Sequence, residues 1–339
     1  MSTVLIYGAT GYSARLILEH TDFASLPGPV ILAGRDETKL QVLAKKWGLS
    51  YQAFTLDSAS TIETQLQNVH TLLNCAGPFA QTAEPLMRAA VRTKTNYLDI
   101  SAELESYLLA EELDQQAKAS GVVLLPGCGV CMTVMVGLTA HVLKRVNTPS
   151  TVSTAIFMPG SITPGTARSA GGDQTLRRLT RSNGDLVSGD SGSAKSFDFR
   201  FDSGPVHTIM FGMPDVIALW HTFKVPNITS YIYMEASSAS SSGASGGDAN
   251  DAADGPSREE REVKRMRASV EVIAADGAVA RSVLETVNGY TMTARAATEA
   301  VRKIMNAAAV KNSGGFHTSA TLFGEDYIQT FDDLSITDL

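Results

Sequence analysis

The chain has 339 residues, of which 44% are hydrophobic and 19% charged; this is typical of a soluble globular protein and is long enough for two domains. Its net charge of −7 disfavours nucleic acid as the main partner, because a phosphate-binding surface is basic. Three cysteines are too few for a disulfide framework, so we expect reduced thiols and a cytoplasmic location. The N-terminus has no charged n-region followed by a long apolar core, so we expect no signal peptide.

The first half of the chain alternates short apolar strands with helical patterns. The strands are rich in Val, Ile and Leu, which predicts βαβ units and a parallel sheet covered on both faces. Six strands with five crossovers are the content of a Rossmann-type, doubly wound sheet. We expect strands at 3–7, 29–34, 50–55, 69–75, 96–100 and 122–125, and helices at 11–20, 36–47, 58–67, 79–93 and 103–119.

One apolar segment, 121–142, is long enough to span a membrane and carries no Asp, Glu, Lys or Arg. However, Pro126, Gly127 and Gly129 interrupt it near the middle. We therefore predict a buried strand, a turn and a buried helix rather than an integral membrane span.

The pattern changes after Pro126 and predicts a second, α+β domain whose sheet is largely antiparallel, since several runs alternate apolar and polar residues. We expect helices at 132–146, from about Thr166 and at 291–311, and strands at 150–158, 197–201, 205–211, 229–235, 264–274 and 279–289.

These patterns divide the chain into three parts. We expect a nucleotide-binding domain at 1–130 and a substrate-binding domain at 131–311, with a C-terminal segment at 312–339 that can pack back on the first domain. Residues 236–257 are Ser-, Gly- and Ala-rich, with almost no apolar mass to bury, which predicts a flexible insertion. Directly after it, Ser257 and Glu260 fit a helix capping box.

The first strand runs into "GATGYSA", a pattern that favours a phosphate-binding turn. Gly8 allows a sharp turn, Gly11 lets the backbone approach a diphosphate, and Ala14 lets the helix lie close to the sheet. The N–H groups from Thr10 to Ser13 would face the anion at the positive end of the helix. The alternative is a purely structural strand-to-helix turn.

The second strand ends in "AGRDETKL", where an NAD site would have an acidic residue to bind the ribose 2′-hydroxyl. Arg35 stands there instead, and a guanidinium matches a 2′-phosphate, which favours NADP(H). Asp36 complicates this interpretation, although it can serve as the N-cap of the following helix. Thr38 and Lys39 could add to the phosphate site.

The fourth and fifth strands end in "NCAGPF" and "YLDISAE". Asn74, Ala76, Gly77 and Pro78 are predicted to form a tight turn at the sheet edge where such folds bind ligands. Asp99 and Glu103 flank the same edge. Asp99 could carry a proton, contact the nicotinamide ribose or cap a helix, and the sequence leaves these roles open.

Other chemical patterns are weaker. Cys128 and Cys131 form a C-x-x-C, which suggests a redox pair, but small residues in a turn near the cofactor are the simpler interpretation. No further ligands lie near them, so we expect no metal site. The chain has no Y-x-x-x-K and no G-x-S-x-G. His317, in "GGFHTSA", follows a Gly-rich turn that could bring it to a cleft, or it could be structural.

The order of "GATGYSARL", "LAGRDETKL", "NCAGPF", "YLDISAE", "PGCGV", "GTARSA" and "GGFHTSATLFGEDYI" resembles that of saccharopine dehydrogenase-like oxidoreductases, in particular the trans-acting enoyl reductase branch. The resemblance spans nearly the whole chain. It implies a Rossmann domain that binds NADPH, a second domain that closes over the substrate, and hydride transfer to a C=C or C=N bond.

The resemblance also implies roles for individual residues. The diphosphate would be held by Gly8, Thr10, Gly11, Tyr12 and Ser13, the 2′-phosphate by Arg35, and the nicotinamide side by Asn74, Ala76, Gly77 and Pro78. For the proton and the polarised acceptor, the candidates are Tyr12, Asp99, Glu103 and His317.

One segment departs from the family pattern: "VCMTVMVGL" follows "PGCG", where the family has a polar run. Its apolar character favours a hydrophobic, lipid- or polyketide-like substrate. We expect a small-molecule substrate, with a synthase or a second copy of the chain as a protein partner. A non-redox enzyme, such as an isomerase or cyclase, and an NADP(H)-sensing protein are alternatives on the same scaffold.

Overall fold

The computed structural model describes residues 2–190, 193–234, 254–306 and 313–339. The chain divides into two compact units, which are described separately below. Unit 1 comprises Met1–Val130 and Thr293–Phe323, and unit 2 comprises Cys131–Met292 and Gly324–Leu339.

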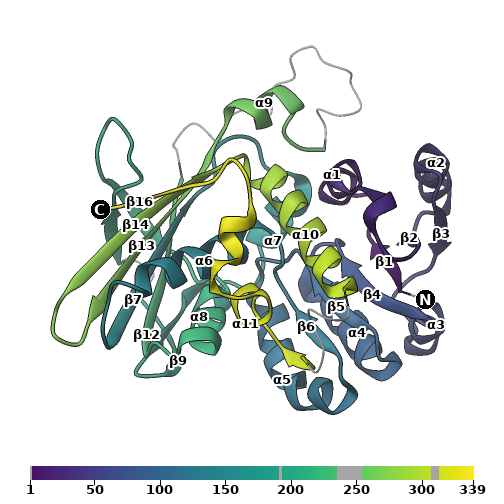
Figure 1. Cartoon of the computed structure of the whole chain (residues 1–339), viewed down its shortest axis with the longest axis horizontal. Helices are drawn as coiled ribbons and strands as arrows, with labels where there is room; N and C mark the ends of the chain where they lie inside the picture. Colours follow the sequence, from purple (N-terminus) through teal and green to yellow (C-terminus); the bar gives the residue numbers. More distant parts are fainter. Residues whose placement is uncertain (1, 191–192, 235–253, 307–312) are drawn as a thin grey trace. The chain divides into compact units, whose positions relative to one another are not determined.

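Unit 1 contains a seven-stranded sheet, sheet A, in the order β15-β6-β5-β4-β1-β2-β3 (Figure 1). Every neighbouring pair is parallel, and the order of β1 to β6 is that of a doubly wound Rossmann fold. This confirms the predicted fold class. The strands are β1 (Thr3–Tyr7), β2 (Val30–Gly34), β3 (Ser50–Ala53), β4 (Val69–Asn74), β5 (Asn96–Asp99), β6 (Val123–Leu125) and β15 (Gly315–Phe316).

Helices cover both faces of sheet A (Figure 1). On one face, α1 and α10 lie together, because Ile17 and Val301 line the same small cavity as Val4 and Ile6 of β1. On the other, α3, α4 and α5 lie side by side. The helices of unit 1 are α1 (Tyr12–His20), α2 (Glu37–Trp47), α3 (Ala59–Gln65), α4 (Phe79–Thr93), α5 (Leu104–Ser120), α11 (Ser319–Phe323), the 3-10 turn η1 (Phe23–Ser25) and, from Thr293 onward, α10 (Gly289–Met305).

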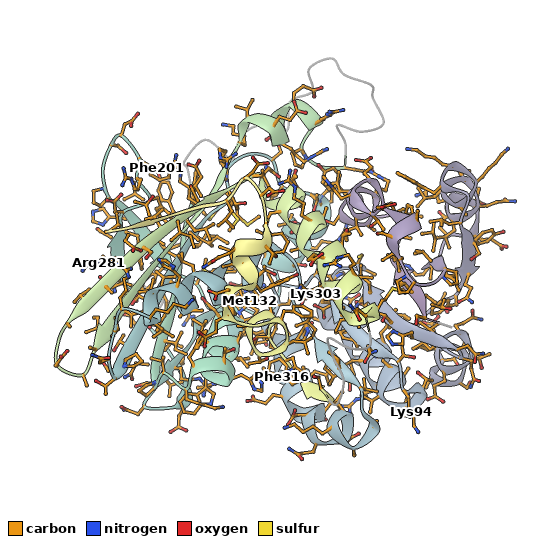
Figure 2. The ribbon with its side chains drawn as sticks, in the orientation of Figure 1. Lys94, Met132, Phe201, Arg281, Lys303 and Phe316 are labelled. Carbon is orange, nitrogen blue, oxygen red and sulfur yellow. The ribbon has the colours of Figure 1, made fainter. Side chains whose placement is uncertain are left out.

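The short strand β15 was not predicted. It joins the edge of sheet A by pairing with β6, with Phe316 opposite Leu124, and Phe316 (labelled in Figure 2) packs edge-on against Tyr107. Two glycines before a single buried aromatic residue carry no strand periodicity, so only the tertiary pairing identifies this strand.

Unit 2 is built on sheet B, whose strands follow the order β10-β11-β12-β7-β13-β14-β16, with β8 pairing β12 and β9. It is antiparallel except for the β12–β7 pair, as the predicted second domain required. The strands are β7 (Pro149–Phe157), β8 (Leu179–Ser182), β9 (Asp185–Ser188), β10 (Ala194–Phe197), β11 (Val206–Met210), β12 (Asn227–Tyr233), β13 (Met266–Ala274), β14 (Val279–Thr286) and β16 (Ser335–Asp338). The remaining elements are α6 (Val130–Leu143), α7 (Pro164–Ala170), α8 (Asp215–Phe223), α9 (Arg258–Val263), η2 (Leu176–Arg178) and η3 (Glu325–Thr330).

The predicted strand at 197–201 is wrong. Only Phe197 belongs to a strand, and the next residues leave the sheet with Arg200 at φ +59°. Arg267 donates to the carbonyl oxygens of Phe199 and Arg200, and Phe201 (labelled in Figure 2) packs edge-on against Phe157. The alternation of aromatic residues therefore reflects packing onto sheet B rather than strand pairing.

The apolar segment 121–142 forms β6, a turn and most of α6, as predicted. In the parts of the chain that the structure describes, every helix is too short or too polar to cross a membrane. The predicted insertion falls largely outside the described residues, as do 307–311 of the predicted C-terminal helix. Ser257 caps α9 as predicted, whereas the Glu260 carboxylate accepts hydrogen bonds from the N–H and hydroxyl of Ser161.

Candidate functional site

The loop between β1 and α1 is closed by backbone hydrogen bonds at the carboxyl edge of sheet A. The N–H groups of Gly8 and Ala9 both donate to the Ala33 carbonyl, at 2.8 and 3.1 Å. The N–H of Gly11 donates to the Gly8 carbonyl at 3.0 Å, and Arg15 donates to the Thr10 carbonyl at 3.1 Å. The loop is thereby anchored to β2 and turns directly into α1.

Gly8 cannot be replaced by a larger residue without moving its neighbours. Its φ is +79°, a conformation that L side chains rarely adopt, and a Cβ there would lie 2.8 Å from the backbone nitrogen of Ala76. A Cβ on Gly11 would lie 3.2 Å from the Gly8 carbonyl oxygen. Glycine at position 8 therefore allows the loop that follows β4 to lie close, and glycine at position 11 allows the tight turn before α1.

Helix α1 begins without a side-chain cap, since its N-cap residue is Gly11. The first N–H groups of a helix have no acceptor within the helix, and they lie at the positive end of its dipole. The predicted diphosphate contacts Thr10, Tyr12 and Ser13 are all partly exposed at this point. An anion such as a diphosphate fits this position.

Arg35 follows β2 and is exposed. Within the described ranges, its guanidinium forms no ion pair or hydrogen bond with the protein. Asp36, which complicated the sequence interpretation, is the N-cap of α2 and accepts a hydrogen bond from the Lys39 N–H at 3.0 Å. Asp36 therefore has a local structural role, and Arg35 can bind a phosphate at the tip of β2.

The loop after β4 is held by buried side chains. Asn74 is completely buried; its Oδ1 accepts from the Ala76 N–H at 3.0 Å, and its Nδ2 donates to Thr82 and Tyr97. Thr82 in turn donates to the Ala76 carbonyl at 2.6 Å. Hydrogen bonds therefore hold both the N–H and the carbonyl of Ala76, whose backbone lies next to Gly8.

Asp99 lies at the end of β5 and is also completely buried. Its carboxylate accepts from the Tyr97 hydroxyl at 2.9 Å and from the N–H groups of Ser101 and Gly127, at 2.9 and 2.7 Å. Burial raises the pKa of Asp99, and these hydrogen bonds, led by that from Gly127, oppose the rise. The carboxylate joins the end of β5 to the turn after β6.

Glu103 precedes α5 and is 3% exposed. Its two oxygens accept from the N–H groups of Phe79 and Ala80, at 3.0 and 2.8 Å. Because Pro78 at the N-cap offers no side-chain hydrogen bond, Glu103 caps α4 from 23 residues or more away in sequence. Sequence reasoning missed this cap, since no local spacing relates Glu103 to α4.

The two remaining acid–base candidates follow strands that are far apart in the order of sheet A. Tyr12 is the first residue of α1, whereas His317 follows β15 at the outer edge of sheet A. The His317 Nε2 donates to the Ser313 carbonyl at 2.9 Å, and Nδ1 lies 3.3 Å from the Thr321 hydroxyl. Burial lowers the pKa of His317. Both of its ring nitrogens are therefore engaged within unit 1.

The cysteines are free thiols. Burial raises the pKa of Cys131 to about 12 and raises the pKa of Cys128 as well. A thioredoxin-type pair requires the opposite, a thiol whose pKa is lowered toward neutrality. Among the described residues, no group of three or more His, Cys, Asp or Glu side chains is arranged to hold a metal ion.

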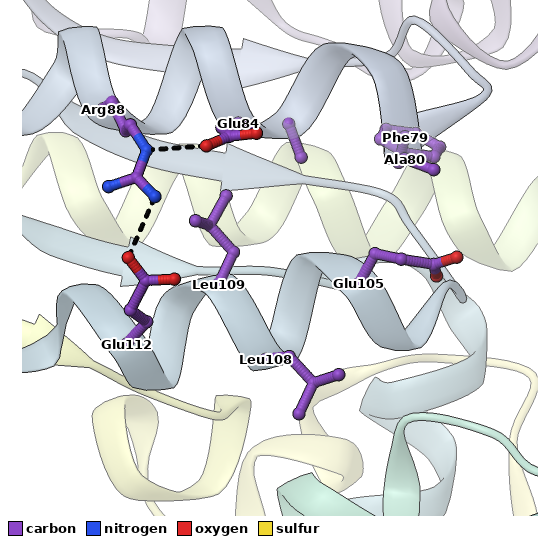
Figure 3. A pocket seen from close by; sticks show the side chains of 9 residues that line it. Phe79, Ala80, Glu84, Arg88, Glu105, Leu108, Leu109 and Glu112 are labelled. Carbon is purple, nitrogen blue, oxygen red and sulfur yellow. Dashed lines mark hydrogen bonds and ion pairs between the residues drawn. The ribbon is translucent and has the colours of Figure 1, made fainter. Parts of the chain in front are cut away.

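A separate hollow of about 330 Å³ lies between α4 and α5 (Figure 3). Arg88 spans it, with its guanidinium nitrogens 2.9 Å from both Glu84 and Glu112. Leu109 points into the space between the helices. Because two carboxylates already neutralise the guanidinium, this hollow does not suit a nucleotide phosphate, unlike the edge of sheet A.

The comparisons with known proteins agree with binding of a nicotinamide cofactor. Residues 4–125 match the family model of the saccharopine dehydrogenase NADP binding domain. The chain is 31% identical over 132 residues to a trans-acting enoyl reductase of Mycobacterium leprae, and 27% identical over 132 residues to one of Mycobacterium ulcerans. Each match covers 37% of this chain and 32% of the relative. The chain thus spans about a third of the length of the curated relatives it matches.

Solved structures share the fold over a longer range. Saccharopine dehydrogenase from Saccharomyces cerevisiae superposes with a TM-score of 0.62 and 14% identity, over 100% of both chains. Homospermidine synthase from Legionella pneumophila, solved in complex with NAD, has a TM-score of 0.62 and 12% identity, over 97% of this chain and 88% of its own. At these identities the likeness concerns the fold alone.

Proposed function

We propose that the protein is an NADPH-dependent reductase, because residues 4–125 match the family model of the saccharopine dehydrogenase NADP binding domain. In this proposal it transfers hydride to a C=C bond of an enoyl or enone group, or to a C=N bond, in a hydrophobic small molecule. Bound NADPH would supply the hydride, and the protein would bind it, orient it and polarise the acceptor.

One observation carries the proposal: three features needed for NADPH meet at the carboxyl edge of sheet A. They are the glycine loop with the uncapped start of α1, Arg35 beyond β2, and the rigid loop after β4. The loop at Gly8 would hold the diphosphate, Arg35 the 2′-phosphate, and Ala76, Gly77 and Pro78 the nicotinamide side. Arg35 supports NADPH over NADH, because NADH has no 2′-phosphate to bind it.

The hydrogen bonds of the acid–base candidates support different roles for them. Both carboxylates, Asp99 and Glu103, accept from groups of the protein, and both nitrogens of His317 are engaged. We therefore assign structural roles to Asp99, Glu103 and His317. Tyr12 stays a proposed group that polarises the acceptor or supplies the proton because of its place at the start of α1, beside the glycine loop.

The substrate and the partner are inferred from the names of the relatives. Two relatives are named trans-acting enoyl reductases, which supports an enoyl substrate and action beside a separate synthase. A lipid- or polyketide-like molecule carrying the enoyl group is the substrate class that we propose; most of the apolar residues of α6 are buried in the protein and do not select between substrates.

A second candidate is an NADP(H)-sensing protein without turnover. The engagement of Asp99, Glu103 and His317 within unit 1 favours it, since it leaves few acid–base groups for catalysis. Oxidation of NADPH in the presence of enoyl thioesters, followed at the absorbance of the reduced cofactor, would support the reductase. Tight NADPH binding without oxidation by any enoyl thioester or imine would support the sensor.

The cofactor assignment is tested by fluorescence titration with NADPH and NADH. We expect wild type to prefer NADPH, and Arg35→Ala to lose about tenfold or more of NADPH affinity with little change for NADH, because a charge-assisted phosphate contact is removed. Lys45→Ala is the matched control, since it removes an exposed cation from the other end of α2. Equal affinities in wild type, or an unchanged preference in Arg35→Ala, would contradict the assignment.

A further inference from the structure

Five buried or partly buried polar residues hold the loop after β4 at the carboxyl edge of sheet A: Asn74, Thr82, Tyr97 and Asp99, whose side chains are linked by hydrogen bonds, and Glu103, which binds the start of α4. We call these five residues the loop frame. It brackets the loop Cys75–Pro78 at both ends: Asn74 and Thr82 bind Ala76, and Glu103 binds the N–H groups of Phe79 and Ala80. Such a polar group is stable when its members satisfy one another.

Tyr97 connects the two halves of the loop frame. It is completely buried in β5, and its hydroxyl accepts from Asn74 Nδ2 at 3.2 Å and donates to Asp99 at 2.9 Å. Burial raises the pKa of Tyr97 well above its usual value, so the hydroxyl keeps its proton. Asp99 then holds the turn after β6 through the Gly127 N–H. Side chains thereby join the ends of β4, β5 and β6 in addition to the backbone pairing of these strands.

These hydrogen bonds fix the position of Ala76. Both the N–H and the carbonyl of Ala76 are bound, and its nitrogen lies where a Cβ of Gly8 would come within 2.8 Å. The backbone of the loop after β4 is therefore held at a fixed distance from the glycine loop after β1. A change in either Ala76 contact would alter the surface between the two loops.

We propose that Thr82 and Tyr97 are positioning residues for the nicotinamide half of the cofactor. Thr82 acts on Ala76 directly and Tyr97 acts through Asn74; together they hold the Cys75–Pro78 loop against which that half would lie, and they transfer no proton. This inference rests on the proposed function, because it takes the edge of sheet A as the NADPH site. It predicts that loosening the loop frame weakens binding of the whole cofactor while sparing the adenosine end.

Thr82→Val tests the proposal, since it removes the hydroxyl that binds Ala76 and keeps the shape of the side chain. Dissociation constants are measured for NADPH by fluorescence and for 2′,5′-ADP, which lacks the nicotinamide half, by calorimetry. We expect NADPH binding to weaken about threefold to tenfold, the effect of one lost hydrogen bond, and 2′,5′-ADP binding to change less than about twofold.

The control is Thr93→Val, the same substitution on the same helix. Thr93 is also partly buried, and its hydroxyl bonds to the Ala89 carbonyl at 2.9 Å near the far end of α4. We expect it to leave both constants within about twofold of wild type. Tyr97→Phe is the second test variant, and it removes one oxygen atom from the middle of the loop frame. Like Thr82→Val, it should raise the dissociation constant for NADPH relative to that for 2′,5′-ADP.

The two failures are distinguishable. If wild type binds neither NADPH nor 2′,5′-ADP, the proposed function fails and this inference fails with it. If wild type binds both, but Thr82→Val and Tyr97→Phe weaken the two ligands equally or leave the ratio unchanged, the reductase proposal stands and the positioning role is wrong. The positioning role is also wrong if Thr93→Val changes the ratio of the NADPH and 2′,5′-ADP dissociation constants as much as Thr82→Val does.

Discussion

Replacing Gly8 by alanine should disrupt unit 1 more than any comparable change at a glycine in an open turn. At Gly8 the substitution forces a side chain into φ +79° and places its Cβ 2.8 Å from the Ala76 nitrogen. Ala76 cannot move away freely, because Asn74 and Thr82 bind its N–H and carbonyl. Gly48 offers a matched comparison: its φ is +66°, but nothing lies within 4 Å of its Cβ position.

The two glycines separate conformational strain from the clash. A left-handed backbone costs an alanine roughly 1–2 kcal/mol, which applies to both positions. Forcing an extra methyl group against packed backbone adds about 1–3 kcal/mol at Gly8 alone. We therefore expect Gly48→Ala to lower the free energy of unfolding by about 1–2 kcal/mol, and Gly8→Ala by about 2–5 kcal/mol.

Urea unfolding followed by circular dichroism measures the difference, and NADPH titration of the folded variants gives a second readout. We expect Gly48→Ala to keep its NADPH affinity and Gly8→Ala to lose about tenfold or more, because the phosphate loop must shift. If Gly8→Ala is as stable as Gly48→Ala and binds NADPH normally, the close contact between the two loops is not the reason for glycine at this position.

Three further outcomes follow from ionisation and burial. The hydrogen bond from His141 lowers the pKa of Asp338 from 3.8, so the stabilising contribution of Asp338 is present above 3.8 and is lost as the pH falls through its folded-state pKa. Asp338→Asn should therefore lower the melting temperature more at neutral pH than in acid below pH 3.8, and an equal loss at both would contradict this. Burial raises the pKa of Asp99 from 3.8, so its contribution to stability is greatest below 3.8 and declines as the pH rises through its folded-state pKa. Asp99→Asn should therefore flatten the decline in thermal stability above pH 3.8, and an unchanged slope would contradict this. Because burial raises the pKa of the Cys128 and Cys131 thiols, both should react with iodoacetamide at neutral pH far more slowly than free cysteine, and a rapidly alkylated thiol in the native protein would refute it.

Local patterns were sufficient for most of unit 1. The apolar runs and the helical periodicity predicted its first six strands and five helices to within a few residues, because each element satisfies its own backbone and buries one predictable face. The cap at Asp36 was also visible locally, since it acts within three residues. In unit 2, α8 and the hairpin β8–β9 were missed.

The functions of single side chains were harder to predict. Glu103 and Asp99 looked like acid–base candidates, yet Glu103 caps a helix that begins 24 residues earlier in sequence, and Asp99 binds a turn 28 residues later. No periodicity encodes such contacts, because they form only when separate strands come together at one edge of a sheet.

The sequence by itself determined the elements and the chemistry at the tips of the strands: the glycines after β1 and the cation after β2 stand at positions that local geometry dictates. The tertiary structure decided which of these strand ends lie close together and which residues contact one another there. Gly8 is required as much by the approach of Ala76 as by its own turn, β15 is a strand only because β6 pairs with it, and the aromatic residues after Phe197 pack on sheet B without pairing. Backbone conformation depends on near neighbours, whereas close approach and burial depend on residues that the chain brings together from far apart.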